Sequence, residues 1–288
     1  MNTVNLKKNK TSLRNLFGLA MTGLATACMI ITVIPLFAVL IYVTVQGVNN
    51  LNLNLFTKLP PPPGLAGGGA GNAIMGTLIV VGLATLMAVP IGVLAAVYLS
   101  EFSKDNQIAQ GVRFATNILS GVPSIISGIF AYGILVATGA LGFSAIAGGV
   151  SLAVLMLPTI IRTTDEALQI FPQDIRWAAL GVGAYNYQTV LFVVLPAAIP
   201  SILTGVTLAI ARAAGETAPL IFTALYSNFW PKGLKEPIAT LSVLVYNFAT
   251  VPFKPQQQLA WACSLLLVVM ILSTSIIARL ATRRKLYG

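Results

Sequence analysis

Residues 162–198 read RTTDEALQIFPQDIRWAALGVGAYNYQTVLFVVLPAA, and this stretch organises the rest of the chain. All five of its charged residues lie in its first half. The run 114–161, which precedes this stretch, and the run 177–211, which begins in its second half, contain no Asp, Glu, Lys or Arg. A helix needs about 20 apolar residues to cross a hydrocarbon core that is about 30 Å thick. Both charge-free runs exceed that length, so residues 162–198 are predicted to form an aqueous loop between two membrane spans.

The composition agrees with a membrane protein. Of the 288 residues, 57% are hydrophobic and only 8% are charged, whereas soluble globular proteins carry about 25% charged residues. A soluble enzyme and a disordered chain are both excluded by these values. There is no histidine and no phosphate-binding loop of the G-x-x-x-x-G-K-[ST] type. We therefore expect a non-catalytic membrane subunit that binds no cofactor or metal itself.

The charge-free runs predict an all-α, polytopic membrane protein with six spans. The run 114–161 is too long for one helix, and the turn at 139–142 is expected to divide it. Residues 238–251 are too short to cross and are predicted to form a re-entrant or surface helix. Cys28 and Cys263 lie in apolar runs and are expected to be small core residues. The six predicted spans are residues 16–46, 73–99, 111–138, 141–161, 199–226 and 259–280.

An even number of spans places both termini on one side of the membrane. Twelve of the 17 Lys and Arg residues flank that side, which the positive-inside rule makes cytoplasmic. The basic excess is thus explained by the membrane, and no nucleic-acid partner is expected. Residues 1–15 and 282–288 would then be cytoplasmic tails, and 73–281 the transport core. Residues 47–72 would form an external loop, in which four prolines followed by glycines predict an extended arm with a flexible joint.

Within the cytoplasmic loop, the sequence predicts short helices. Capping and acidic residues after Arg162 are typical of a helix start, and Pro172 interrupts that helix. A second helix is expected from Gln173 to Leu180, and a third stretch from Asn186 to Leu195 is expected to end at Pro196. Short helices joined by small residues would form a compact cytoplasmic knob, which is suited to a groove on a partner protein.

The knob resembles the EAA loop of ABC importer permeases. Ala178 and Ala179, followed at the family's spacing by Gly183, carry the resemblance together with Leu195 and Pro196. Ala and Gly at four-residue spacing also occur in ordinary packing of membrane helices. Trp177 stands where the family usually has Glu. The resemblance implies an ATPase-coupling role for residues Trp177, Ala178, Ala179, Gly183, Leu195 and Pro196.

Further motifs are similar to those of permeases from bacterial phosphate ABC importers, on the PstA side of the permease pair. They are 215–219 (GETAP), 157–164 (LPTIIRTT), 72–78 and the proline-rich loop 59–64. This resemblance implies the type I importer architecture, with a MetI-like fold, in a bacterial plasma (inner) membrane. It also implies four partners: a PstC-like permease, an ATPase dimer (PstB-like) that holds ATP and Mg, an external phosphate-binding protein (PstS-like), and membrane lipid.

Two charged residues lie deep in the predicted fifth span. A charge at the centre of a membrane helix costs at least about 2.5–3.5 kcal/mol, and Arg212 and Glu216 could partly neutralise each other at i and i+4. They form either a structural ion pair or part of an anion pathway. Arg162 is either an interfacial anchor or a further pathway residue. The family resemblance implies translocation roles for Arg212, Glu216 and Arg162.

Three other functions remain open at this point. A permease for another oxyanion, such as sulfate or molybdate, fits the loop spacing equally, although the segment 215–219 favours phosphate. An ion-driven secondary transporter would need neither the knob nor an ATPase. A membrane scaffold without transport activity would need no pathway charges.

Overall fold

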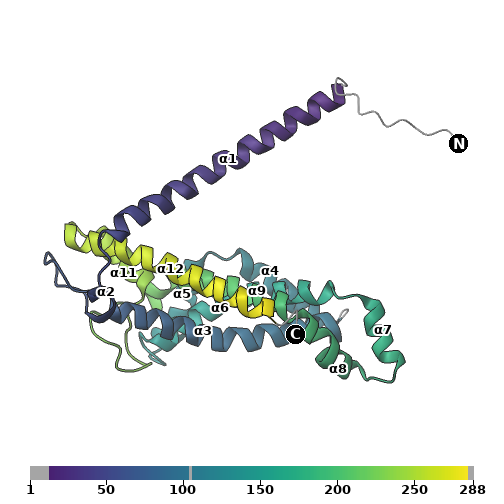
Figure 1. The fold of residues 1–288 in the computed structure, drawn as a ribbon. Helices are drawn as coiled ribbons and strands as arrows, with labels where there is room; N and C mark the ends of the chain where they lie inside the picture. Colours follow the sequence, from purple (N-terminus) through teal and green to yellow (C-terminus); the bar gives the residue numbers. More distant parts are fainter. Residues whose placement is uncertain (1–12, 104–105, 285–288) are drawn as a thin grey trace.

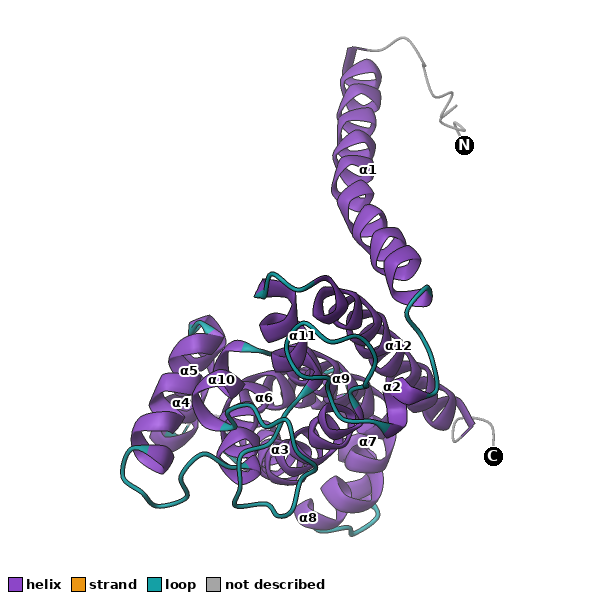
Figure 2. Ribbon diagram, turned by 90° about the vertical axis from the view of Figure 1, so that its left-hand side faces the viewer, coloured by secondary structure: helices purple, strands orange, loops and turns teal. Residues whose placement is uncertain are grey.

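The computed structural model describes residues 13–103 and 106–284, and this part of the chain contains helices and loops but no strand (Figure 2). In chain order the elements are α1 (Leu13–Val48), α2 (Asn54–Thr57), α3 (Gly71–Val97), the π-helical turn η1 (Tyr98–Phe102), α4 (Gln107–Gly121), α5 (Ser124–Ala131), η2 (Tyr132–Val136), α6 (Ala145–Gln169), α7 (Gln173–Gly181), α8 (Asn186–Thr189), η3 (Val190–Val194), α9 (Leu195–Gly215), α10 (Ala218–Thr223), α11 (Leu241–Thr250) and α12 (Lys254–Arg284).

Among the described residues, five helices are long and apolar enough to cross a membrane. They are α1, α3 with η1, α6, α8 to α9, and α12. The pair α4 and α5–η2 would supply a sixth span, but it is bent by 109°. The prediction of one helix over 111–138 was therefore wrong. Pro123 lacks an N–H group and disfavours helical geometry at Val122, so the helix breaks at these two residues.

The core is built on close packing between α3 and α6. A β-carbon at Gly92 of α3 would lie 2.7 Å from Ile160 of α6, and one at Gly149 of α6 would lie 2.9 Å from Leu83 of α3. Buried alanines such as Ala84 and Ala88 continue this interface. Small residues let helix backbones approach closely, which is how membrane helices associate without a hydrophobic driving force.

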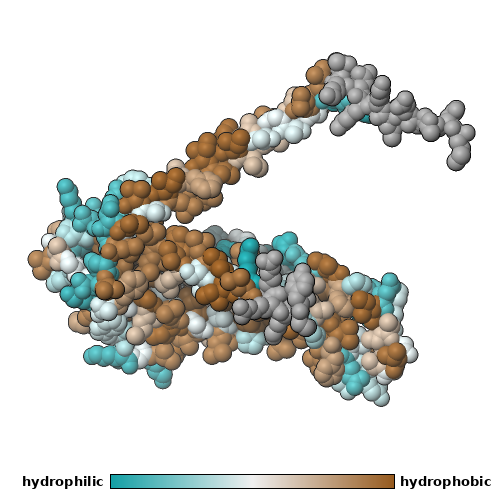
Figure 3. Space-filling model, viewed as in Figure 1, coloured by the Kyte–Doolittle hydropathy of each residue, from teal (hydrophilic) through white to brown (hydrophobic). Residues whose placement is uncertain are grey.

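Helix α1 lies apart from this core. Figure 1 shows it leaving the helical body at the end where α2 and α11 lie. Its contacts are with α12, where Gly47 meets Leu265 and the rings of Tyr42 and Trp261 lie 5.1 Å apart. Hydrophobic residues make up much of the face of α1 that Figure 3 shows, interrupted by paler patches. Cys28 is exposed on this helix, so the expectation of a core residue was wrong there, whereas Cys263 is buried as expected.

The proline- and glycine-rich loop that precedes α3 is folded, and the prediction of an extended, flexible arm was wrong. The Gln256 side chain donates a hydrogen bond of 2.8 Å to the carbonyl of Pro62. The Gly69 N–H donates to Leu59, and a β-carbon at Gly69 would collide with the carbonyl of Asn54. Glycine is therefore required for the loop to close on itself.

Two expectations about the region 162–198 were also wrong. Arg162 does not start a helix, because α6 continues without a break to Gln169. Pro196 does not end one, because residues 186–215 form a continuous helix. The π-helical turn η3 ends two residues before Pro196, whose nitrogen has no hydrogen to donate to a helical hydrogen bond. The short helix after Pro172 is confirmed as α7.

Candidate functional site

The charged pair Arg212–Glu216 lies at a helix end. Helix α9 stops at Gly215, and Glu216 has extended backbone geometry (φ −71°, ψ 130°). The predicted span 199–226 is thus divided into α9 and α10, and the placement of both charges inside one helix was wrong. The two side chains still meet, with Nε of Arg212 3.5 Å from Oε1 of Glu216. The Arg212 side chain is 60% exposed and that of Glu216 only 17%.

Neighbouring helices hold the break between α9 and α10. The hydroxyl of Ser242 on α11 donates a 2.8 Å hydrogen bond to the backbone carbonyl of Glu216. A β-carbon at Gly128 of α5 would lie 2.5 Å from Cα of Pro219. Arg212 therefore projects from the carboxyl end of a fixed helix, where the helix dipole favours a cation.

Arg162 lies in the carboxyl-terminal half of α6. Its Nε donates to Oε1 of Glu166 at 3.0 Å, and both side chains are exposed. Arg162 and Glu166 border a cavity of about 320 Å³ that also contains a second ion pair, Arg113–Asp165, at 3.0 Å. That second pair was missed from the sequence, since its members are 52 residues apart.

The structure places the two pathway candidates at different depths. Gly205 of α9 lies directly against the side chain of Thr163, the neighbour of Arg162 on α6. Arg212 is seven residues further along α9, which corresponds to about 10 Å at a rise of 1.5 Å per residue. Arg212 therefore lies about 10 Å along α9 from the level at which α9 contacts Thr163.

The predicted coupling residues divide into two groups. Trp177, Ala178 and Ala179 lie on α7, and Gly183 follows it with a φ of +92°, which glycine adopts without strain. Leu195 and Pro196 lie instead in the first turn of α9. Figure 1 shows α7 and α8 together at the end of the molecule opposite α2 and α11.

The surface of the knob formed by α7 and α8 is more apolar than we expected from the sequence. The Trp177 side chain is 65% exposed, and Val182, five residues further along the chain, is exposed as well. The rings of Tyr185 and Tyr187 are stacked with their centroids 5.9 Å apart, and both are exposed. Exposed aromatic clusters of this kind are typical of protein interaction sites.

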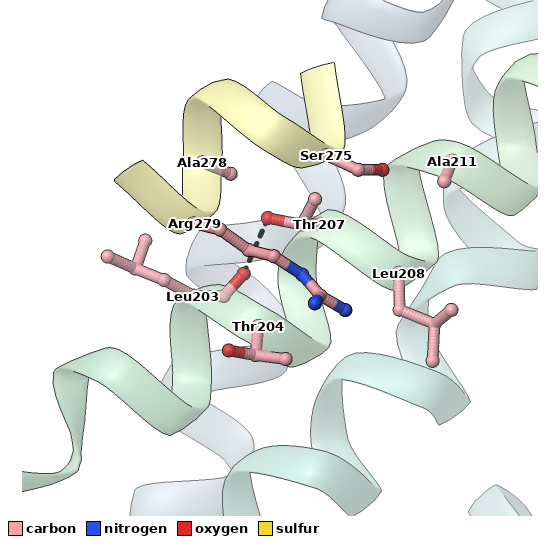
Figure 4. Close-up of a pocket in the computed structure, with 8 residues that line it drawn as sticks. All are labelled: Leu203, Thr204, Thr207, Leu208, Ala211, Ser275, Ala278 and Arg279. Carbon is pink, nitrogen blue, oxygen red and sulfur yellow. Dashed lines mark hydrogen bonds between the residues drawn. The ribbon is translucent and has the colours of Figure 1, made fainter. Parts of the chain in front are cut away.

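A smaller pocket of about 200 Å³ lies between α9 and α12 (Figure 4). Arg279 of α12 lies there beside the hydroxyl-bearing residues Thr204 and Thr207 of α9. The Thr207 hydroxyl donates to the carbonyl of Leu203 at 2.7 Å, and Thr204 donates to Pro200 at 2.9 Å. These hydroxyl protons are therefore used within the helix. Among the described residues, no group of three or more His, Cys, Asp or Glu side chains could hold a metal ion.

The comparisons with known proteins agree on one family. Residues 88–287 match the family described as binding-protein-dependent transport system inner membrane component. The chain is 40% identical to the phosphate transport system permease protein PstA of Yersinia pestis, over 91% of this chain and 88% of that protein. It is also 40% identical to PstA of Haemophilus influenzae, over 92% and 93% of the two chains.

Solved structures show the same fold at lower identity. A chain of a bacterial alginate ABC transporter aligns with a TM-score of 0.68 and 15% identity, covering 97% of this chain and 99% of that one. A chain of the MetNI methionine ABC transporter, solved in inward-facing conformations, aligns with a TM-score of 0.59 and 20% identity, covering 74% and 94%. The chain therefore belongs to the family of binding-protein-dependent transport system inner membrane components, as a multi-pass, all-helical membrane protein with the MetI-like fold of ABC transporter permeases and with PstA permeases among its relatives.

Proposed function

We propose that this chain is the membrane-spanning permease subunit of an ATP-driven phosphate importer. The observation that carries the proposal is Arg212, a guanidinium that is 60% exposed near the end of an apolar candidate membrane span. Support for phosphate as the substrate comes from the PstA relatives, which are 40% identical over nine-tenths of the chain.

The chemistry of the site suits a tetrahedral oxyanion. A guanidinium presents two parallel N–H groups that match the oxygens of phosphate. Glu216 lies at the outer limit of hydrogen-bond distance from Arg212, at 3.5 Å. A nearby carboxylate limits how tightly the guanidinium holds an anion, and a transport pathway must release its substrate as well as bind it.

The exposure of Arg212 implies a partner. A charged side chain is expensive against lipid, so it normally faces a second protein surface or a water-filled cavity. We infer that a PstC-like second permease covers this face of α9 and completes the pathway. Lipid would surround the remaining apolar surface, including that of α1.

The knob formed by α7 and α8 would be the docking site for the ATPase. We propose that an ATPase dimer (PstB-like) supplies ATP and Mg and hydrolyses the ATP, since the sequence contains no phosphate-binding loop of its own. Trp177, Ala178, Ala179 and Gly183 would form the contact, and Leu195 and Pro196 would connect it to α9. A phosphate-binding protein (PstS-like) would deliver substrate on the opposite side, and both termini would be cytoplasmic in the bacterial plasma membrane.

Substrate-specific uptake tests this proposal. The transporter, purified with its associated subunits and reconstituted in liposomes, should import labelled phosphate when ATP and the binding protein are supplied. Sulfate and molybdate are tested in parallel, and preferential uptake of either would contradict the choice of substrate. Uptake that continues without ATP under an ion gradient would contradict the ABC mechanism. Uptake that is unaffected by Arg212→Ala would remove Arg212 from the pathway.

A further inference from the structure

Arg176 is buried, although it sits on a helix whose other side chains are mostly exposed. Its neighbours Ile175 and Trp177 face outward, whereas the Arg176 side chain is only 10% exposed. A buried guanidinium is costly unless its donors are paired. Its orientation toward the body of the protein therefore needs a structural reason beyond solvation.

The guanidinium is held at the end of α6. Nη1 donates to the carbonyl of Phe171 at 2.7 Å, and Nη2 donates to the carbonyl of Leu168 at 2.8 Å. Its Cζ also lies 5.5 Å from the centroid of the Phe171 ring, within the range of a cation–π contact. Leu168 is fully buried and belongs to the main core, so these contacts attach α7 to the carboxyl end of α6.

The same guanidinium also reaches the end of α3. Nη2 lies 2.8 Å from Oε1 of Glu101, whose side chain is only 7% exposed. Glu101 lies in η1, the π-helical turn that continues α3. Arg176 and Glu101 are 75 residues apart in the chain, so this ion pair joins elements that the backbone does not connect locally.

A second arginine reinforces this junction. Arg113 of α4 donates to the carbonyl of Leu99 in η1 at 3.1 Å and pairs with Asp165 of α6 at 3.0 Å. The ends of α3 and α6 are thus joined to each other independently of α7. Arg176 adds α7 to a junction that is already rigid.

We propose that Arg176 is a positioning residue that makes α7 move as one unit with the ends of α3 and α6. The proposal rests on the proposed function, in which an ATPase displaces α7. The α3–α6 pair is the most extensive helix interface of the described chain, so a displacement of α7 would reach the packed core directly. The route from α7 to α9 is different, because it passes through Gly183 and the short helix α8.

The ion pair can be tested because single and double variants differ in the buried charge that they leave behind. Arg176→Met or Glu101→Met alone leaves one buried charge without its partner and should lower the amount of folded protein. The double variant Arg176→Met with Glu101→Met removes both charges and replaces them with side chains of similar length. It should assemble, because replacing a whole buried ion pair with apolar groups is often tolerated.

The experiment uses the assembled transporter in liposomes and measures three quantities: ATPase co-purification, ATP hydrolysis with binding protein present, and anion imported per ATP hydrolysed. The double variant should retain the ATPase and hydrolyse ATP, while anion imported per ATP falls by about tenfold, a typical size for coupling between sites. Glu101→Gln keeps a carbonyl acceptor for Arg176 and should retain more coupling than the double variant. Arg14→Met, at an exposed position on α1, is the matched control and should match the wild type.

If the double variant imports as much anion per ATP hydrolysed as the wild type, the proposal is overturned, since the ion pair would then serve folding alone. Loss of ATPase co-purification would also overturn it, because Arg176 would then act on docking rather than on transmission. If the double variant does not assemble, Glu101→Gln decides: coupling below that of the wild type supports the proposal, and equal coupling contradicts it. Phosphate, sulfate and molybdate are all assayed. If the wild-type transporter imports an anion other than phosphate, the proposed substrate is contradicted. The amount of that anion imported per ATP still tests the role of Arg176.

Discussion

Nε of Arg212 lies 3.5 Å from Oε1 of Glu216, although helix α9 ends at Gly215, between the two residues. The pair is long for an ion pair, and its two members differ in exposure. Arg212 is open to the surface that we assign to the second permease, whereas Glu216 is held by its backbone to Ser242 of α11. This geometry leaves the guanidinium free to exchange the carboxylate for a substrate anion.

Arg212→Ala should reduce phosphate uptake by about 10- to 150-fold, because one charge-assisted contact to an anion is worth about 1.5–3 kcal/mol. Arg212→Lys should retain part of the activity, since an ammonium keeps the charge but loses the bidentate geometry. Initial uptake rates in liposomes measure both. Ser201→Ala, exposed on the same helix, is the control, and equal losses in all three variants would contradict the prediction.

Glu216→Gln should strengthen anion binding and slow release. The carboxylate competes with phosphate for Arg212, so its neutralisation should lower the half-saturating phosphate concentration by up to about fivefold, the effect of an ion pair worth about 0–1 kcal/mol. The maximal rate should fall together with this concentration. A half-saturating concentration that rises would show that Glu216 instead orients Arg212 for binding.

Arg162→Gln distinguishes a pathway role from simple anchoring. The exposed Arg162–Glu166 pair contributes about 0–1 kcal/mol to stability, so this variant should fold and insert normally. If Arg162 receives the anion after Arg212, maximal uptake should fall by about tenfold with little change in half-saturation. Protein level in the membrane is measured alongside uptake. Unchanged uptake would leave Arg162 as an interfacial anchor.

Much of the fold could be predicted because charge-free length is a strong signal. The runs that predicted spans 16–46, 73–99 and 259–280 correspond to α1, α3 with η1, and α12. The errors arose where composition stays apolar while the backbone changes direction. The break at Val122 and Pro123 and the end of α9 at Gly215 both carried local signals, a proline and a glycine, that hydropathy alone does not register.

The candidate site was less predictable than the fold. Arg212 and Glu216 are close in sequence, so their pairing followed from helical spacing even though the helix ends between them. The pairs Arg113–Asp165 and Arg176–Glu101 join residues 52 and 75 positions apart. A single amino-acid sequence contains no signal for contacts between residues so far apart, and Arg176 was visible only as one more basic residue near the membrane.

Gly205→Val should destabilise the protein, because Gly205 lies directly against Thr163 and a larger side chain must separate α9 from α6. Overpacking of this kind costs about 1–3 kcal/mol, which should lower the Tm of the detergent-solubilised transporter by several degrees. Gly111→Val on α4 is the matched control, since its β-carbon would meet nothing within 4 Å. An equal Tm for the two variants would contradict the close α6–α9 contact.

Trp177→Ala should weaken association with the ATPase. The indole is 65% exposed on α7, and the exposed residue Val182 and the stacked rings of Tyr185 and Tyr187 follow it in the chain. Exposed tryptophans that become buried at interfaces commonly contribute about 2 kcal/mol or more, so the ATPase should dissociate about 30-fold more readily in a dilution or pull-down series. Gln173→Ala, exposed at the start of the same helix, should leave association unchanged.

Because Trp177 replaces the glutamate typical of related loops, Trp177→Phe should retain most of the binding and Trp177→Glu should not, if the partner's groove is apolar. The opposite order would show that the groove carries a cation, and that the aromatic surface of α7 does not set the affinity.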